Sequence, residues 1–198
     1  MNNLSVSDAQ LGILNRIVPG AVEAVPLQRA LGRVLAEDIH ANRDQPPYDV
    51  SAMDGFALRS ADLRDTPTPL TVIDDIKAGD RSAKTVERDQ CARIMTGAPV
   101  PGGADAVIRV EDTRGLADGR VEILLPVAAG NNIRRRGEGM RNGQVVLTAG
   151  TEITPAIIGI LAMVKSAQVP VYGHPRVAIL ATGDELEDLG DAFDPEKI

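Results

Sequence analysis

The stretch NRDQPPY, residues 42–48, decides how this chain is divided. Its polar residues and paired prolines cannot continue a helix or a central strand, because proline lacks the backbone N–H that both structures use. Just before it, the run from Val34 to Ile39 has the apolar, β-prone character of a strand. We therefore interpret residues 42–48 as the crossing from one domain into another.

The segment that follows the crossing has the pattern of a small β-rich domain. Between Ser51 and Gly139 the apolar runs are short, and Gly, Pro and Asp separate them. These runs cover residues 70–73, 106–110 and 121–125. No helical pattern of three turns occurs among them. We predict a β-rich domain over residues 42–142, inserted into the domain that surrounds it.

The first forty residues predict two helices and then a strand. Ser5 or Ser7 can cap a first helix that ends at Pro19 and Gly20. Pro26 can begin a short second helix, which Gly32 ends before the β-prone run.

The other flank has a similar character. Thr154 and Pro155 form an N-cap followed by proline at the first helical position, which predicts a helix to about Ala167. Strands are expected at 169–172 and 176–181. We predict that residues 1–41 and 143–173 form one discontinuous α/β domain.

The sequence RVAILATGDEL, residues 176–186, has the form of a buried strand that ends at a glycine turn. Doubly wound α/β domains begin in this way. Parallel sheets need crossovers of about a dozen residues or more between strands, and fewer than two such lengths follow this run. We expect residues 174–198 to be the start of a truncated doubly wound domain.

Composition excludes several classes of function. The formal net charge of −7 argues against a nucleic-acid partner, which needs a cationic face. Cys91 is the only cysteine, so a disulfide framework and a cysteine-based zinc site are excluded. The chain shows neither a signal peptide nor an apolar run of membrane-spanning length. We expect a cytoplasmic protein with no membrane partner.

Two clusters in the β-rich segment can carry chemistry. In SAMDG, residues 51–55, Asp54 precedes a glycine and is either a turn residue or a carboxylate that helps to bind Mg²⁺. In MTGAP, residues 95–99, Thr96 and Gly97 offer a hydroxyl and backbone N–H groups that can bind phosphate. The alternative for this second cluster is an ordinary loop between strands.

Two further clusters are charged. Arg134, Arg135 and Arg136 are adjacent, and they form either a solvated charge run or a site for phosphate or molybdate. In ATGDEL, residues 181–186, a strand end meets polar side chains, where ligand sites in open α/β sheets are found.

These clusters, in this order, resemble a known family. The stretches PPYDVSAMDGFA, RIMTGAPVPGGADAVI, NIRRRGEGMRNGQVVLTAGTEITPAIIG and PRVAILATGDEL resemble successive signatures of MoeA and the gephyrin E domain. The resemblance covers nearly the whole chain. It implies transfer of molybdenum from molybdate to adenylylated molybdopterin, with release of AMP and with Mg²⁺ assisting.

The resemblance also implies the site residues. It places Asp54, Thr96, Asp184 and Glu185 in the catalytic cleft, and it assigns Mg²⁺ to Asp54, Asp184 and Glu185. It further implies a homodimer in which two chains complete each site, and contact with other molybdenum cofactor biosynthesis proteins. The substrate-binding residues are Ser51, Gly97, Arg134, Arg135, Arg136, Glu138 and Thr182.

Two departures from the family pattern weigh on the activity. Where the family commonly has GED, this chain has Gly137, Glu138 and Gly139, so one cleft carboxylate is missing. In the family, the pterin-binding loop and the lysines of the third domain follow the part that this chain resembles, so the resemblance implies that residues 1–198 do not include them. We expect residues 1–198 alone to be inactive, and the alternative function is a dimeric binding or scaffold module of the gephyrin type. The resemblance does not distinguish molybdate from tungstate.

Overall fold

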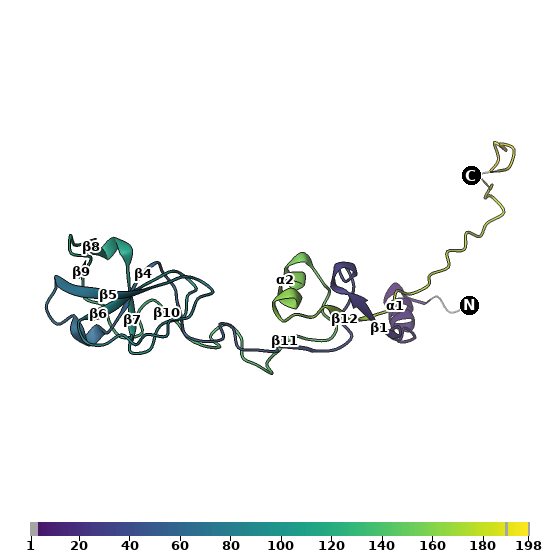
Figure 1. Ribbon diagram of the computed structural model, residues 1–198. Coiled ribbons are helices and arrows are strands. Elements are labelled where there is room, and N and C mark those ends of the chain that lie inside the picture. Colours follow the sequence, from purple (N-terminus) through teal and green to yellow (C-terminus); the bar gives the residue numbers. More distant parts are fainter. Residues whose placement is uncertain (1–3, 189, 198) are drawn as a thin grey trace.

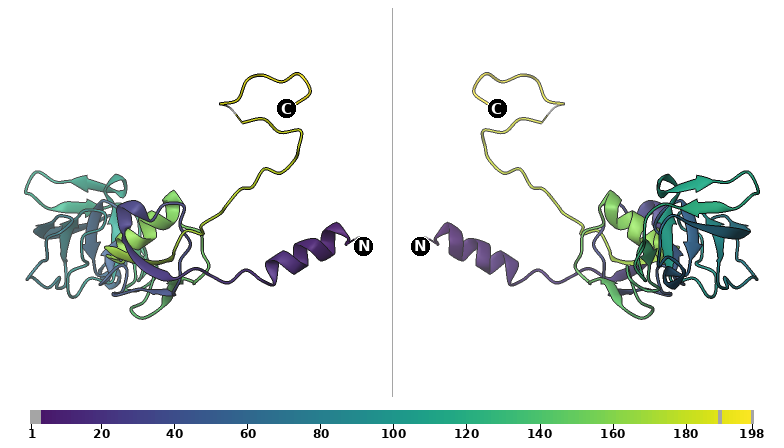
Figure 2. Two further views of the ribbon diagram at one scale, coloured as in Figure 1. Left: turned by 90° about the vertical axis from the view of Figure 1, so that its right-hand side faces the viewer. Right: turned by 90° about the vertical axis from the view of Figure 1, so that its left-hand side faces the viewer.

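The computed structural model describes residues 4–188 and 190–197. Figure 1 shows a β-rich lobe and a smaller lobe, joined by two stretches of chain that run side by side. Both the N-terminal helix and the C-terminal segment lead away from the smaller lobe, as the views in Figure 2 show.

The β-rich lobe is built on a six-stranded mixed sheet with the strand order β7-β4-β6-β5-β9-β8. β5 and β6 are parallel, and the other neighbouring pairs are antiparallel. The three predicted apolar runs fall on β5, on β7 and on β9, which confirms their β character. The strands are β4 (Gly55–Leu58), β5 (Thr68–Ile76), β6 (Gln90–Ile94), β7 (Ala106–Arg109), β8 (Thr113–Gly115) and β9 (Val121–Ile123).

Each face of this sheet has its own core, because side chains alternate between faces along a strand. Phe56 and Leu58 of β4 pack with Cys91 on one face, while Ala57 packs with Val107 on the other. Burial raises the pKa of the Cys91 thiol to about 12, so this cysteine is not a nucleophile at neutral pH. Two short 3₁₀ helices, η2 (Ser60–Asp62) and η3 (Val110–Asp112), connect strands of this lobe.

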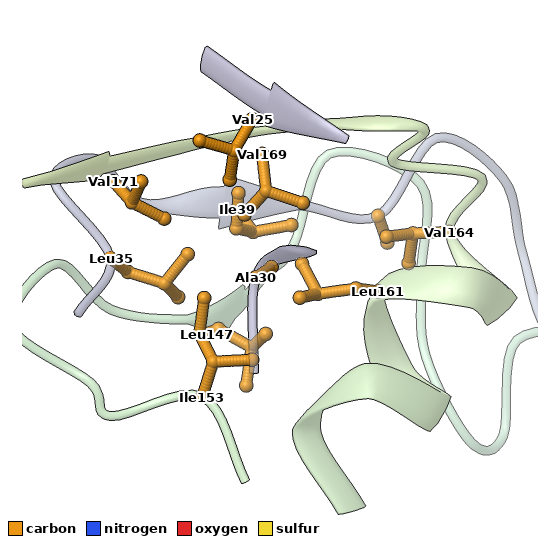
Figure 3. Close-up of a cluster of buried hydrophobic side chains, with 11 residues drawn as sticks. Val25, Ala30, Leu35, Ile39, Leu147, Ile153, Leu161, Val164, Val169 and Val171 are labelled. Atoms are coloured by element: carbon orange, nitrogen blue, oxygen red, sulfur yellow. The ribbon is translucent and has the colours of Figure 1, made fainter. Parts of the chain in front are cut away.

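The smaller lobe combines residues from both flanks of the β-rich segment. Strand β1 (Val22–Pro26) pairs antiparallel with β12 (Gln168–Tyr172), and helix α2 (Pro155–Met163) packs beneath them. Figure 3 shows their shared core, in which Val25 and Leu35 from one flank meet Leu161 and Val169 from the other. The lobe therefore holds segments distant in sequence together, while the domain boundaries stay a prediction.

The predicted helix at Thr154 is confirmed. The Thr154 hydroxyl accepts a hydrogen bond from the N–H of Ile157, and Pro155 occupies the first helical position. The helix ends at Met163, earlier than predicted, and Lys165 follows in a left-handed conformation with a φ of 58°.

The start of the chain corrects two predictions. Helix α1 (Val6–Leu14) has the expected Ser5 cap but ends well before Pro19, and none of its residues is buried. Pro26 ends a strand instead of starting a helix, and the 3₁₀ helix η1 (Leu27–Arg29) follows it. Pairing with β12 explains this difference, because a tertiary partner overrides a local preference.

The two lobes are joined by residues 39–51 and 133–147, which we call the connection. Within it, β2 (Ile39–His40) pairs with β11 (Val145–Leu147), and β3 (Val50–Ser51) pairs with β10 (Ile133–Arg134). The stretch at residues 42–48 lies between these two pairings. Its interpretation as a crossing between domains stays a prediction.

The strand predicted from Arg176 to Ala181 is not formed. These residues are extended and exposed, and the side chain of Ile179 is 91% exposed. A buried strand needs neighbours to satisfy its backbone N–H and C=O groups, and residues 174–188 and 190–197 supply no other strand. The doubly wound fold is therefore absent from the described part of the chain. None of the described helices is long and apolar enough to cross a membrane.

Candidate functional site

The structure brings Asp54 and Thr96 together from two separate sequence clusters. Asp54 lies in the bend between β3 and β4, and Thr96 follows β6. The backbone N–H and the hydroxyl of Thr96 both donate to Oδ1 of Asp54, each at 2.7 Å. Both residues are exposed, and in the described residues Oδ2 of Asp54 accepts no hydrogen bond. The pair is thus a fixed carboxylate with one oxygen open to a ligand.

Backbone contacts hold the two loops against each other. Ser51 N–H donates to the carbonyl of Ala98 at 2.9 Å, and Gly97 N–H donates to the carbonyl of Ser51 at 2.8 Å. The Ser51 hydroxyl is buried and donates to the carbonyl of Met53 at 2.6 Å. Ser51 therefore shapes the loop that carries Asp54, and its hydroxyl is not exposed for a substrate.

Of the two alternatives for Thr96 and Gly97, the structure has the loop between strands, here β6 and β7, and not a phosphate-binding nest. The N–H of Thr96 donates to Asp54, that of Gly97 to Ser51, and that of Ala98 to Met95 at 2.9 Å. All three donors are thus used within the protein, so none is free for a phosphate oxygen. The Thr96 hydroxyl and the glycine remain exposed beside the carboxylate.

Gly55 fixes the start of β4 beside Asp54. A Cβ atom at this position would lie 1.8 Å from the carbonyl oxygen of Ile108 on the neighbouring strand. No side chain fits there, so glycine is required for close approach of the two backbones. The Asp54-Gly55 pair consequently has a packing reason in addition to its turn character.

Asn132 holds the other side of the same loop and was not recognised from the sequence. Its carbonyl accepts from the N–H of Ala52 at 2.9 Å, and its side-chain amide donates to the carbonyl of Val107 at 2.9 Å. Its φ of 54° lies in the left-handed region, which asparagine tolerates better than most residues. The Asn131-Asn132 pair was the signal in the sequence that could have indicated this turn.

The electrostatic surroundings keep Asp54 ionised. The backbone N–H of Thr96 lowers the pKa of Asp54 most, and the Thr96 hydroxyl lowers it further. Burial opposes this lowering of the pKa, and the charge of Arg93 makes the smallest contribution to it. Arg93 lies on β6 and is exposed. It was also missed by the sequence analysis, although it is the charged residue in the otherwise apolar strand sequence CARIM.

Two surface hollows adjoin the Asp54 loop. One is lined by Met53, Arg109 and Asp112, together with Asn131, Asn132 and residues 125–127. The other contains Arg93 and Val110, and the N–H of Val110 donates to the backbone carbonyl of Asp54 at 3.0 Å. In the first hollow Arg109 is paired with Asp112 at 2.9 Å, which neutralises its charge.

The arginine triplet lies in the connection, where each member meets a carboxylate. Arg134 pairs with Glu138 at 3.4 Å, Arg135 with Asp49 at 2.6 Å, and Arg136 with Asp44 at 2.5 Å. Each guanidinium therefore already has an anionic partner. This arrangement matches the solvated charge run rather than an oxyanion site.

Glu138 and Gly139 lie in the turn that follows the triplet. A carboxylate oxygen of Glu138 accepts from the backbone N–H of Arg135 at 2.9 Å, so Glu138 helps to form this turn. A Cβ atom at Gly139 would lie 3.1 Å from the carbonyl oxygen of Gln45, tighter than most such contacts. The glycine is suited to the close passage of the two stretches of the connection.

Thr182, Asp184 and Glu185 are all exposed in the C-terminal segment, away from the β-rich lobe (Figure 1). The turn predicted there is formed, since the N–H of Leu186 donates to the carbonyl of Gly183 at 3.2 Å. Within one chain the structure does not bring these side chains to Asp54. Among the described residues, no three His, Cys, Asp or Glu side chains lie close enough together to hold a metal ion.

Comparison with known proteins gives consistent results. A family model described as MoeA N-terminal region (domain I and II) matches residues 4–164. A molybdopterin molybdenumtransferase of Bacillus subtilis (strain 168) is 41% identical over 186 residues, which cover 90% of this chain and 43% of the relative. One from Staphylococcus aureus (strain Mu50) is 40% identical over 201 residues, covering 100% of this chain and 48% of the relative.

A solved structure supports the same relationship. The molybdopterin biosynthesis moeA protein from Pyrococcus horikoshii OT3 superimposes with a TM-score of 0.79 at 38% identity, over 84% of this chain and 45% of that one. This chain spans about half the length of the curated relatives it matches, at 43% and 48%.

Proposed function

Because this chain belongs to the MoeA family by its N-terminal region, we propose that it forms part of an enzyme of molybdenum cofactor biosynthesis. The proposed reaction is insertion of molybdenum from molybdate into adenylylated molybdopterin, with release of AMP. The relatives are named molybdopterin molybdenumtransferases, which supports this choice. The free, buried Cys91 suits the reducing cytoplasm.

One observation carries the proposal for the site. Two hydrogen bonds of 2.7 Å from Thr96 fix Oδ1 of Asp54 and leave Oδ2 open at the surface. The lowered pKa keeps this carboxylate ionised at neutral pH. A fixed, charged acceptor can orient a donor group of the substrate, because it needs no reorganisation when the substrate binds. Thr96 is accordingly a positioning residue as well as part of the surface.

We place the second half of the site on a partner subunit. Asp184 and Glu185 lie far from Asp54 within one chain, so a homodimer would be required to bring such carboxylates to it. Exposed apolar side chains on α1 support a further contact surface, since Leu14 is 62% exposed.

A magnesium site of Asp54, Asp184 and Glu185 is not assembled by the described residues, so we derive no step through Mg²⁺. The Arg triplet is not retained among the proposed substrate ligands, because its members already pair with carboxylates. Contacts with other cofactor-biosynthesis proteins stay a prediction.

A chimeric enzyme tests the proposed function. Residues 1–173 of this chain are joined to the remainder of the Bacillus subtilis relative, and molybdenum insertion is measured with adenylylated molybdopterin and molybdate. We expect turnover by the chimera and only background by residues 1–198 alone, which lack much of the length of the relatives. A folded chimera without turnover would contradict the proposed enzymatic function and favour a gephyrin-type scaffold module.

A further inference from the structure

The hollow at Arg93 is a candidate binding site that no motif identified. It opens on the face of the six-stranded sheet that holds Phe56, and the β8–β9 hairpin forms one wall. Its volume is about 480 Å³, which is within the range of small-molecule sites. It is lined by Phe56, Val72, Arg93, Val110, Thr113, Gly115, Leu116, Gly119, Arg120 and Val121.

The floor of this hollow is apolar. Phe56 and Val121 belong to the core of that sheet face, and Val72 packs against the same core from β5. Val110 at the rim is 44% exposed, and Leu116 in the hairpin turn is half-buried. Phe56 and Val121 are buried, so Val110, Val72 and Leu116 supply the accessible apolar surface against which a ring can pack.

Two arginines, Arg93 and Arg120, line the hollow, and only one of them is free of an ion pair among the described residues. Arg120 pairs with Asp118 at 2.8 Å. Arg93 forms no ion pair within 4.0 Å in the described residues, although Asp75 is its register partner on β5. An exposed guanidinium without a carboxylate partner can bind a phosphate through two parallel hydrogen bonds.

The hollow is contiguous with the Asp54 loop. Val110 lines it and donates its N–H to the carbonyl of Asp54, and the charge of Arg93 reaches the Asp54 carboxylate. A ligand in the hollow would therefore lie beside the Asp54 loop, although Asp54 itself does not line the hollow.

From these observations we infer that the Arg93 hollow binds a phosphorylated heteroaromatic ring, with the ring on the apolar floor and the phosphate on the Arg93 guanidinium. The inference rests on the proposed function, whose substrate carries two such rings, a purine and a pterin, joined through phosphates. It adds a binding subsite for one of them on this chain.

Titration calorimetry on residues 1–198 tests the subsite with defined probes. AMP and a pterin carrying one phosphate are compared with adenosine and with inorganic phosphate. We expect one of the two phosphorylated rings to bind with a dissociation constant below about 1 mM, and adenosine or phosphate alone to bind at least about tenfold more weakly, since each lacks one of the two contacts. The ring that binds identifies which end of the substrate the hollow accepts.

Two variants and a control locate the binding. Arg93→Gln should weaken it about tenfold through loss of the charged hydrogen bonds. Val110→Trp should also weaken it by filling the mouth of the hollow. Arg114→Gln removes the same charge from β8 at a residue outside the hollow, where Arg114 pairs with Glu122, and should leave binding unchanged.

The possible results separate the inference from the proposed function. Binding that survives both Arg93→Gln and Val110→Trp, or no binding by either phosphorylated ring, overturns the subsite. An equal loss of affinity in Arg114→Gln and Arg93→Gln also overturns the subsite, because the loss then follows from the change in net charge. If the chimera is active and any of these results is found, the proposed enzymatic function stands and only the subsite is rejected.

Discussion

The arginine triplet at 134–136 and the Asp54–Thr96 pair both stand out in the sequence, but their environments in the structure are opposite. The triplet has the higher density of charge, and each guanidinium is already paired with a carboxylate of the connection. Asp54 has no ion pair in the described residues, and one of its oxygens is open. A ligand competes with existing partners at the first region and with water alone at the second.

The difference shows that a charged side chain with a fixed position and no ion pair indicates a binding site better than a high local number of charges does. In the connection, charge serves structure, because Asp44 and Asp49 each join the two stretches of chain. At Asp54, backbone contacts from Ser51, Gly55 and Asn132 serve to fix one carboxylate. Substitutions in each region should therefore separate loss of folding from loss of turnover.

The largest effect is expected at Gly55. Gly55→Ala places a Cβ atom 1.8 Å from the carbonyl oxygen of Ile108, so β4 and β7 must move apart at a cost of about 3 kcal/mol. The melting temperature should fall accordingly. Gly115→Ala is the matched control, since nothing lies within 4 Å of its Cβ position. Equal melting temperatures for the two variants would show that the strands are not so closely packed.

Asp54→Asn should act on turnover in the chimeric enzyme. The asparagine carbonyl can still accept both hydrogen bonds from Thr96, so the loop is kept while the charge is lost. We expect turnover about tenfold lower or more and a nearly unchanged melting temperature. Asp80→Asn, at an exposed turn, serves as the control for loss of one negative charge. Normal turnover with a reduced melting temperature would make Asp54 a structural turn residue.

Arg135→Gln should have a smaller effect, because exposed ion pairs contribute little to stability. Arg135 is 59% exposed and pairs with Asp49, and such pairs are typically worth about 0–1 kcal/mol. Turnover of the chimera should therefore stay within about twofold of the unchanged protein. A loss as large as that of Asp54→Asn would return the triplet to the catalytic site. Arg114→Gln, another paired and exposed arginine, provides the comparison.

Local patterns predicted those parts of the fold that depend on local chemistry. The Thr154 cap and the apolar runs of the β-rich lobe are examples, since hydrogen bonding within a turn and alternation along a strand determine them. β1 was missed because its partner β12 lies more than a hundred residues away. The strand at 176–181 was expected from its apolar residues, but neighbours that would pair with it are not present among the described residues.

In the candidate site, too, local motifs could be recognised from the sequence, whereas contacts between distant residues could not. Asp54 and Thr96 were both singled out by their motifs, and only the folded chain shows that they meet. The sequence left a phosphate nest and an ordinary loop open at Thr96, because it does not reveal that the N–H groups of Thr96, Gly97 and Ala98 are already used. Arg93 and Asn132 were missed because their importance lies in what surrounds them.

The smallest effect is the acid dependence of the connection. The backbone N–H of Arg136 lowers the pKa of Asp49 most, with further lowering by Arg135 against an opposing effect of burial. A carboxyl whose folded-state pKa is below its unfolded value stabilises the fold above the unfolded value. That contribution is lost as the pH falls through the folded pKa.

The amide resonance of Arg136 should report this change because its N–H donates to Asp49 at 2.9 Å. Between about pH 6 and about pH 2, it should shift with a midpoint below 3.8, the ordinary value for aspartate. Arg135→Gln should move that midpoint upward, since it removes the guanidinium that favours the ionised form. The resonance of Thr96 should also titrate below 3.8, through Asp54, and should not respond to Arg135→Gln. A shared response of both resonances would mean that the two regions are electrostatically coupled, and a midpoint above 3.8 for Arg136 would remove Asp49 as its ionised partner.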